Sequence, residues 1–428
     1  MTARNLSQWL AYLEQLHPSA IDMGLERVRA VSRQLGLTRP AARVVTVTGT
    51  NGKGSTCAFV ANLLRAHGHR VGVYSSPHLL RYNERVLIEG QPADDAALCA
   101  AFMAVEQARG DISLTYFEMG TLAAFWLFEQ QALDAVVLEV GLGGRLDAVN
   151  IVDPDVSVIT NIGLDHAEWL GDTRDSVARE KAGIYRAGRP AICGDRQPPV
   201  SLLTAAQELG CSLQLNGRDF MWAETEGRWA WQGVRRTGDV VTLSGLPILR
   251  LPMDNAAVAL QAFAQLDMGW ELERIREALL ATAMPGRLQS ICVNWQGKAV
   301  NVLLDVAHNP HAATFLAEYL AAHPVAGTRR VAFGVLADKN LEGILQPLKE
   351  QLSDWCVATL NCPRARAAAD VANVLAEYGL QVTQADSLAQ AIEVQCTKSQ
   401  ADDEVLVFGS FYSVAEALLW LEQLPVVK

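Results

Sequence analysis

The chain has 428 residues, of which 50% are hydrophobic and 19% charged, and its formal net charge is −11. A chain of this length exceeds what one hydrophobic core usually organises, so we expect two domains. Because no long run of lysine or arginine offsets the acidic charge, the composition argues against a nucleic-acid partner. No apolar segment is long enough to cross a bilayer, so we expect no membrane partner. Eight scattered cysteines, no C-x-x-C pair and no signal sequence indicate a reducing, cytoplasmic location.

The first part of the chain alternates helix and strand patterns. We expect helices in the first forty residues with a break at His17-Pro18, a buried strand at 43–48 and a helix at 55–66. Further along we expect strands at 71–74, 135–140 and 156–160 and a helix at 121–129. This alternation predicts a mostly parallel sheet that is wound with helices on both faces.

Residues 216–246 interrupt the alternation, because three tryptophans lie there among charged residues and Gly-Asp turns. We expect a small antiparallel excursion whose tryptophans serve packing. A helix at 271–283 stops near Met284-Pro285-Gly286-Arg287, which indicates a domain boundary. Beyond it, strands at 300–306, 330–336, 355–360 and 404–408 alternate with helices such as 312–322 and 414–421. The predicted fold class is α/β: a doubly wound domain at 1–287 and a smaller, Rossmann-like α/β domain at 288–428.

A phosphate loop is predicted between the first strand and its helix, from Gly49 to Thr56 (GTNGKGST). Such a loop presents backbone N–H groups, a helix dipole and Lys53 to an anion. Its sequence departs from the common phosphate-loop pattern G-x-x-x-x-G-K-[ST]. Val47 replaces the first glycine, and Gly54 separates Lys53 from the hydroxyl residues that follow. The loop therefore predicts a polyphosphate site of a variant kind.

Three polar side chains follow predicted strands: Ser76, Glu139 and His166. Each has a structural interpretation of its own, as a turn hydroxyl, a solvated acid or a core histidine. The carboxyl ends of parallel strands meet at one edge of a sheet, so as a set they predict a magnesium site beside the phosphate loop. Lys181 lies at a predicted helix end, where the pattern alone favours a solvated lysine or a partner of the helix dipole.

In the second domain, a strand leads into Asp305-Val306-Ala307-His308-Asn309-Pro310-His311. Two histidines, an aspartate and an asparagine at one strand end predict a ligand-facing loop that closes over the nucleotide of the first domain. A metal site made by His308 and His311 alone is disfavoured, because no third ligand has suitable spacing.

The whole chain resembles the folylpolyglutamate synthase/dihydrofolate synthase branch of the Mur ligase superfamily, and its bifunctional bacterial type most closely. The resemblance rests on motifs in a specific order and spacing: TGTNGKGS, VGVYSSPHLLRYNER, ISLTYFE, LEVGLGGRLDAVNI, TNIGLDH, REKAGI, PGR, DVAHNPHA and FGSF. It implies the Mur ligase architecture and an ATP-dependent ligase. This enzyme would add L-glutamate to 7,8-dihydropteroate and to the γ-carboxylate of folate glutamate tails, through an acyl phosphate.

The resemblance also implies roles for individual residues. ATP would be bound by Asn51, Gly52, Lys53, Gly54, Ser55, Thr56, Asn255, Arg287 and Asp305. Of these, Arg287 and Asp305 would reach across the interdomain cleft. Magnesium would be bound at two sites, by Ser76, Glu139 and His166 and by Lys181 as a carbamate, and a monovalent cation is a further expected cofactor. The pterin and its benzoate arm would contact Asp22, Met23, Gly24, Leu25, Thr115, Phe117, Leu146, Asp147 and Ala148. Lys53, Lys181, Arg287 and His308 would be the catalytic residues, with His308 contacting the incoming phosphoryl group or glutamate.

Several alternatives remain at this stage. The chain could be a P-loop nucleotide hydrolase or nucleotide switch, but this alternative gives no function to the second domain or to the motif DVAHNPHA. A non-catalytic nucleotide-binding module would leave Glu139, His166 and Lys181 unexplained. Within the family, a cell-wall Mur ligase or a synthase that only extends folate tails is the alternative, and residues 21–25 with ISLTYFE favour folate over a cell-wall precursor. The expected partners are small molecules, namely dihydropteroate, reduced folates and L-glutamate, and we expect a monomer.

Overall fold

The structure is a computed structural model that describes residues 4–424. It divides into two compact units, one ending at Ala283 and one beginning at Met284. The division falls slightly before the expected boundary at Arg287.

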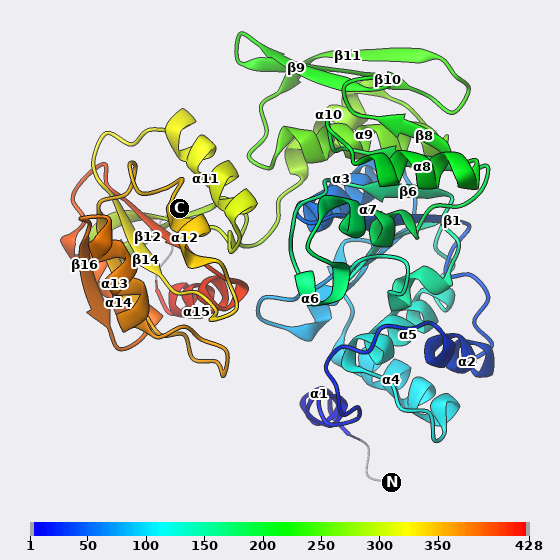
Figure 1. Cartoon of the computed structure of the whole chain (residues 1–428), viewed down its shortest axis with the longest axis horizontal. Helices are drawn as coiled ribbons and strands as arrows, with labels where there is room; N and C mark the ends of the chain where they lie inside the picture. The colour runs from blue at the N-terminus through cyan, green and yellow to red at the C-terminus, as the bar shows by residue number, and fades with distance from the viewer. Residues whose placement is uncertain (1–3, 425–428) are drawn as a thin grey trace. The chain divides into compact units, whose positions relative to one another are not determined.

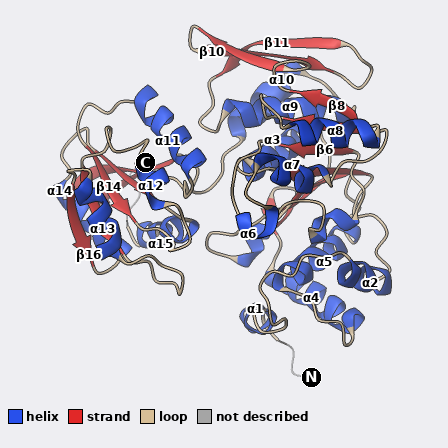
Figure 2. Ribbon diagram, in the orientation of Figure 1, coloured by secondary structure: helices blue, strands red, loops and turns tan. Residues whose placement is uncertain are grey.

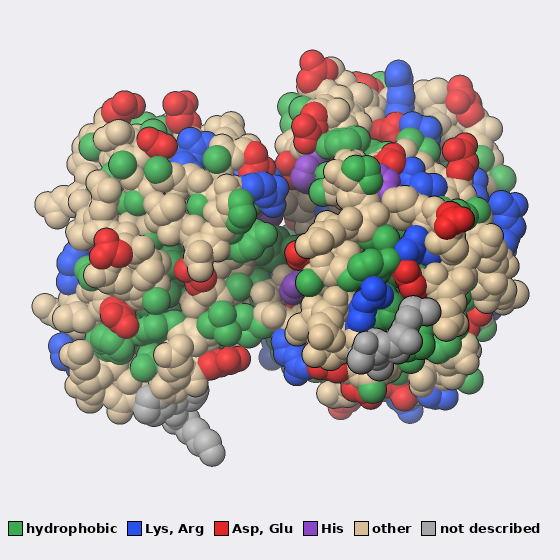
Figure 3. Space-filling view, turned by 90° about the horizontal axis from the view of Figure 1, so that it is seen from below, with side chains coloured by type: hydrophobic (Ala, Val, Ile, Leu, Met, Phe, Trp, Pro, Cys, Tyr) green, Lys and Arg blue, Asp and Glu red, His purple; other side chains and the backbone are tan. Residues whose placement is uncertain are grey.

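Among the described residues, no helix is both long and apolar enough to span a membrane. On the face drawn in Figure 3, lysine and arginine side chains are scattered among acidic ones.

The first unit is built on an eight-stranded sheet with the order β4-β3-β2-β5-β1-β6-β7-β8. Its strands are β1 Arg43–Thr48, β2 Val71–Tyr74, β3 Val86–Ile88, β4 Gln91–Pro92, β5 Ala135–Glu139, β6 Val156–Ile159, β7 Pro190–Cys193 and β8 Ser212–Leu215. All pairings from β2 to β8 are parallel, and the two antiparallel pairings, β2 with β3 and β3 with β4, lie at one edge. The predicted mostly parallel sheet is confirmed, and its inner strands are apolar because helices cover both faces.

The helices of the first unit are α1 Leu6–Leu13, α2 Glu26–Gln34, α3 Lys53–Ala66, α4 Asp95–Arg109, α5 Tyr116–Glu129, α6 Ala167–Leu170, α7 Arg174–Ala182, α8 Val200–Leu209, α9 Met253–Leu266 and α10 Leu272–Ala281, with 3-10 turns η1 Tyr82–Arg85 and η2 Ala148–Ile151. Helices α3, α9 and α10 pack together on one side of the sheet, and α5, α7 and α8 lie on the other (Figure 1), as right-handed crossovers require. Helix α5 begins before the predicted Thr121, because Thr115 and Glu118 form a capping box.

The predicted antiparallel excursion is confirmed as a three-stranded sheet of β9 Met221–Thr225, β10 Arg228–Val234 and β11 Val240–Pro247 (Figure 2). Trp229 and Trp231 are buried beneath it. The indole Nε1 of Trp231 donates to the carbonyl of Ala257 in α9 at 3.1 Å, and that of Trp229 donates to Pro247 O at 2.7 Å. The packing interpretation of these two tryptophans is therefore confirmed.

The second unit has a six-stranded sheet with the order β12-β13-β17-β14-β15-β16. Its strands are β12 Gln289–Trp295, β13 Lys298–Leu304, β14 Arg329–Phe333, β15 Asp354–Ala358, β16 Gln381–Ala385 and β17 Glu404–Phe408, and its helices are α11 Pro310–Ala322, α12 Leu341–Leu345, α13 Ala368–Glu377, α14 Leu388–Lys398 and α15 Phe411–Leu421. Only β12 is antiparallel to its neighbour. The rings of Phe333, Trp355 and Phe408 contact one another in its core.

We expect Trp231→Ala to lower the free energy of unfolding by about 3–5 kcal/mol, because it leaves a large cavity between the excursion and α9. Urea denaturation followed by circular dichroism measures this loss. The matched control is Trp222→Ala on β9, since the Trp222 side chain is partly exposed. An equal or larger loss in the control would contradict the packing role of Trp231.

Candidate active site

Two glycines give the phosphate loop its shape, because a side chain at either would collide with a neighbouring residue. Gly49 has a φ of +151°, and a Cβ there would lie 1.8 Å from Thr160 Oγ1. Gly52, which precedes α3, has a φ of +80°, and a Cβ there would lie 2.4 Å from Asn255 Oδ1. Both positions favour glycine for conformation and for space. The loop is thus a backbone cradle at the N-terminus of α3, as an anion site requires.

The segment that follows β6 fixes the phosphate loop through hydrogen bonds. The carbonyl of Asn51 accepts from Thr160 Oγ1 at 2.6 Å and from Asn161 Nδ2 at 2.9 Å. The N–H of Asn51 donates to Asn161 Oδ1 at 3.0 Å. The hydroxyl of Thr50 donates to Gly163 O at 3.0 Å and accepts from Gly163 N at 2.9 Å. These bonds fix the backbone before any ligand binds.

Polar side chains complete the cradle. Lys53 Nζ donates to Gly49 O at 3.0 Å and to Thr50 O at 3.3 Å, so its charge lies over the loop. Asn255, at the start of α9, donates from Nδ2 to Ser55 Oγ at 2.7 Å, which brings a residue predicted from far along the chain to the loop. Thr56 is fully buried, and its N–H donates to Gly52 O at 3.0 Å. Its hydroxyl has no hydrogen-bond partner among the described residues, and its contact with ATP stays a prediction.

Ser76 and Glu139 lie together at the ends of β2 and β5. The N–H of Ser76 donates to Glu139 Oε2 at 3.2 Å, and the Glu139 side chain is buried. His166 lies instead with Lys53 and Lys181 around a small cavity, whose lining residues are Thr48, Gly49, Thr50, Lys53, Val140, Gly141, Leu142, Gly143, Asp165, His166, Leu170 and Lys181. Within residues 4–424, no three side chains of His, Cys, Asp or Glu form a group able to hold a metal.

Lys181 is buried, with only 3% of its surface exposed, so the interpretation as a solvated lysine is wrong. The cause is close packing of the last turn of α7, since Arg145 N donates to Glu180 O at 2.8 Å and a Cβ on Gly144 would lie 3.1 Å from Lys181 O. Burial, and then the charge of Lys53, lower the pKa of Lys181 to about 7, against the opposing effect of Asp165 and Asp147. Near neutral pH, a large share of this amine is therefore uncharged.

The three segments predicted to bind the pterin and its benzoate arm come together in the first unit. The Phe117 ring lies against Gly141, where a Cβ would be 2.7 Å from its Cζ. Met23 Cε would lie 3.7 Å from a Cβ on Gly143. The carbonyl oxygen of Gly143 accepts a hydrogen bond from Thr48 Oγ1 at 2.6 Å. This bond joins residues 141–143, which form one wall of the cavity, to the end of β1. Residues 141–143 therefore border both the phosphate-loop cavity and the predicted substrate segments.

Asp147 holds that wall in place. Its buried carboxylate accepts from Leu142 N at 2.9 Å and from Val149 N at 3.0 Å. Burial raises the pKa of Asp147 to about 6, against these backbone donors and the charge of Lys53. The hydrogen bonds of the Asp147 carboxylate therefore shape the loop of residues 142–149.

In the second unit, Asp305 is buried and both of its carboxylate oxygens accept backbone N–H groups, from Leu288 at 2.9 Å and from Ala307 at 2.8 Å. Burial raises the pKa of Asp305, and the charge of Arg287 opposes that shift. Arg287 lies over the Phe411 ring, 4.9 Å from its centroid. The Nδ1 of His308 donates to Val306 O at 2.8 Å, which fixes its tautomer.

Four residues around the loop and the cavity were not predicted as functional from the sequence, namely Thr48, Thr160, Asn161 and Asp165, although the last three stand in the motif TNIGLDH. The signal that could have found them is the position of this motif at the end of β6, next to β1. Their role depends on pairing between strands that are far apart in sequence.

The residues present fit a nucleotide with a divalent cation. The glycine cradle and Lys53 suit polyphosphate oxygens, and the adjacent hydroxyl of Ser76 and carboxylate of Glu139 are hard oxygen donors. A magnesium ion typically takes one or two protein oxygens and completes its shell with water and phosphate oxygens. This donor set is therefore sufficient for such an ion.

Comparisons with known proteins identify the family of the chain. Residues 47–195 match the Mur ligase middle domain, and residues 286–411 match the Mur ligase, glutamate ligase domain. The chain is 46% identical to the dihydrofolate synthase/folylpolyglutamate synthase of Escherichia coli, covering 97% of this chain and 95% of that protein.

Solved structures show the same similarity. E. coli FolC in complex with DHPP and ADP superposes with a TM-score of 0.92 at 45% identity, covering 98% of each chain. The bifunctional folylpolyglutamate synthase/dihydrofolate synthase of Yersinia pestis, complexed with AMPPNP and Mn ion, gives a TM-score of 0.90 at 44% identity over 98% of each chain. A similarity of this extent includes both units, so the chain has the Mur ligase architecture and belongs to the dihydrofolate synthase/folylpolyglutamate synthase family.

Proposed function

We propose that this protein is an ATP-dependent ligase that joins L-glutamate to 7,8-dihydropteroate, giving dihydrofolate, and to the γ-carboxylate of folate glutamate tails. The observation that carries the proposal is the shared wall at residues 141–143. It borders the cavity of Lys53 and Lys181 on one side and contacts Met23 and Phe117 of the predicted substrate segments. A carboxylate of a substrate bound there would lie beside the phosphates. The names of the relatives, and the nucleotides bound in their structures, support the same reaction.

The chemistry needs no side-chain nucleophile. An oxygen of the substrate carboxylate attacks the γ-phosphorus of ATP, the bond to the β-phosphate oxygen breaks, and ADP leaves. The amine of glutamate then attacks the acyl carbon, loses a proton, and displaces inorganic phosphate as the amide forms. Lys53 neutralises the charge that develops on the transferred group, and the rigid loop behind it keeps the phosphates aligned.

We propose that Ser76, Glu139 and His166 hold one magnesium ion, and that Lys181 holds a second as a carbamate. Bound magnesium would supply additional positive charge near the phosphates. Carbamylation joins the neutral amine of Lys181 to the carbon of CO₂ with loss of a proton, and the lowered pKa of Lys181 makes that neutral amine available. The product is an anion, which would remove the repulsion between Lys181 and Lys53.

We also propose roles for the second unit. Arg287 would bind the nucleotide phosphates, and His308 would contact the incoming phosphoryl group or glutamate. Asp305 would support the nucleotide site by fixing residues 286–288 through its bond to Leu288 N. We further propose that the protein binds a monovalent cation and that it is a monomer.

ADP release distinguishes this reaction from simple ATP hydrolysis. It should require a carboxylate substrate and glutamate together, because the acyl phosphate is consumed only by the amine. The assay compares dihydropteroate, tetrahydrofolate and a cell-wall precursor, each with and without glutamate. ADP release that depends neither on the carboxylate substrate nor on glutamate would refute the ligase activity. Activity with tetrahydrofolate but none with dihydropteroate would reduce the proposal to tail extension.

Gly52→Ala should weaken ATP binding by at least about tenfold, because its Cβ would collide with Asn255 and open the cradle. Equilibrium titration with a fluorescent ATP analogue measures this effect. Gly217→Ala is the matched control: its φ of +86° is similar, but nothing lies within 4 Å of the added Cβ. Equal losses in both variants would show that backbone strain, rather than the cradle, is responsible.

Lys181→Ala should remove most of the ligase activity, and short carboxylates such as acetate should restore part of it by replacing the carbamate. The measurement is the rate of dihydropteroate-dependent ADP release with and without acetate. Full activity in the variant would remove the carbamate from the proposal.

A further inference from the structure

One arginine of helix α2 joins two of the segments that border the predicted substrate pocket. Arg27 Nη1 lies 2.7 Å from Asp22 Oδ2, and Arg27 Nη2 donates to Asp22 O at 2.9 Å. The same Nη2 donates to Glu118 Oε1 on α5 at 3.0 Å. One guanidinium therefore holds the loop before α2 against the first turn of α5, although these segments are far apart in sequence.

The partners of Arg27 are themselves fixed to residues that we assign to the pocket. The second oxygen of Glu118, Oε2, accepts from Thr115 N at 2.7 Å, so the buried carboxylate connects Arg27 to Thr115. Asp22 is also held by His17, whose Nε2 lies 3.3 Å from Asp22 Oδ2. Both Ser19 N, at 3.1 Å, and Ser19 O, at 3.0 Å, lie within hydrogen-bond distance of His17 Nδ1, which holds the ring beside Asp22.

The environment makes this connection strong. The Glu118 side chain is only 4% exposed and that of Arg27 28% exposed, so water screens their pairing little. A guanidinium bonds with several N–H groups in one plane and can satisfy two partners at once, which a lysine cannot do in the same geometry. Without Arg27, Glu118 would be a buried carboxylate that has lost its cation.

We propose that Arg27 is a positioning residue that sets the spacing between the loop of Asp22 to Leu25 and the N-terminus of α5. It thereby shapes the site for the pterin and its benzoate arm. The inference rests on the proposed function, which places those segments around the substrate. Arg27 acts through Asp22 and Glu118, so its loss should weaken binding of the pteroate substrate and leave ATP binding unchanged.

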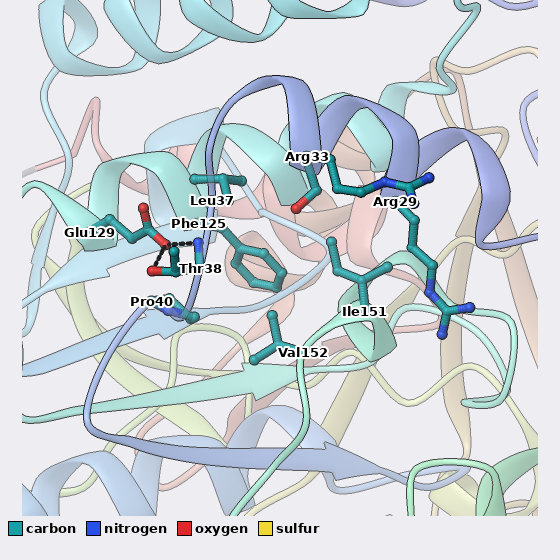
Figure 4. A pocket seen from close by; sticks show the side chains of 10 residues that line it. Arg29, Arg33, Leu37, Thr38, Pro40, Phe125, Glu129, Ile151 and Val152 are labelled. Carbon is teal, nitrogen blue, oxygen red and sulfur yellow. Dashed lines mark hydrogen bonds between the residues drawn. The ribbon is translucent and has the colours of Figure 1, made fainter.

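The chain offers a matched control on the same helix. Arg29 and Arg33 line a separate cavity of about 260 Å³ beside α2, together with Phe125 and Glu129 (Figure 4). In the part of the chain that the structure describes, neither arginine side chain makes a hydrogen bond or an ion pair. Arg29→Met therefore removes the same charge from α2 without breaking a hydrogen bond or an ion pair.

The test compares Arg27→Met, Arg27→Lys and Arg29→Met by their KM for dihydropteroate, their KM for ATP and their unfolding temperature. We expect Arg27→Met to raise the KM for dihydropteroate by at least about tenfold while the KM for ATP stays within about twofold. Arg27→Lys should recover part of the loss, and Arg29→Met should match the wild type.

Two results would overturn the inference. One is a KM for dihydropteroate in Arg27→Met that stays within about twofold of the wild type. The other is an equal rise of both KM values with a lower unfolding temperature, which indicates general destabilisation. In either case, dihydropteroate- and glutamate-dependent ADP release by the wild type leaves the proposed function standing. Absence of that release in the wild type would instead reject the function, and the inference with it.

Discussion

The central place of β1 in its sheet is the constraint on which the rest of the site depends. β1 pairs in parallel with β5 on one side and β6 on the other, with Val47 opposite Glu139 and Thr48 opposite Ile159. The three carboxyl ends therefore finish at one level, where the chain turns into the phosphate loop, the loop after Glu139 and the segment that contains His166. Ligands gather at such a point in doubly wound sheets because the loops diverge there. A shift in this register would separate every group of the site at once.

Charge is the second organising feature. Lys53 and Lys181 border the same small cavity, and two cations in a partly dry space repel each other. Burial, and then this repulsion, lower the pKa of Lys181, and the proposed carbamate would make its side chain an anion. Two buried carboxylates have a different task, since Asp147 of the first unit and Asp305 of the second each accept two backbone N–H groups. Asp147 and Asp305 therefore shape loops, and Lys53 is the cation that we propose to interact with phosphate.

Much of the fold could be predicted from local pattern. The β-branched run of β1 and the apolar spacing of α3 mark the core of the first unit, and β17 has the predicted bounds. Edge strands such as β4 and β16 were missed because they are short or largely polar, and their pairing is decided by neighbours far away in sequence.

The site was less accessible to such reasoning. The sequence placed Ser76 and Glu139 at strand ends, and the structure brings them into contact. The burial of Lys181 could not be predicted, because it results from packing of α7 against the loop of Gly144. The sequence around Arg27 is that of an ordinary polar helix and gives no sign of a special role. Only the tertiary structure shows the three contacts of its guanidinium with Asp22 and Glu118.

The tryptophan-rich excursion has a consequence for the nucleotide site. Helix α9 carries Asn255, which contacts Ser55 of the phosphate loop, and two residues later Ala257 accepts the indole N–H of Trp231. The small antiparallel sheet thus braces the helix that touches the cradle, from outside the main sheet. A substitution in this peripheral sheet would therefore reach the phosphate loop through α9, without altering a residue of the loop itself.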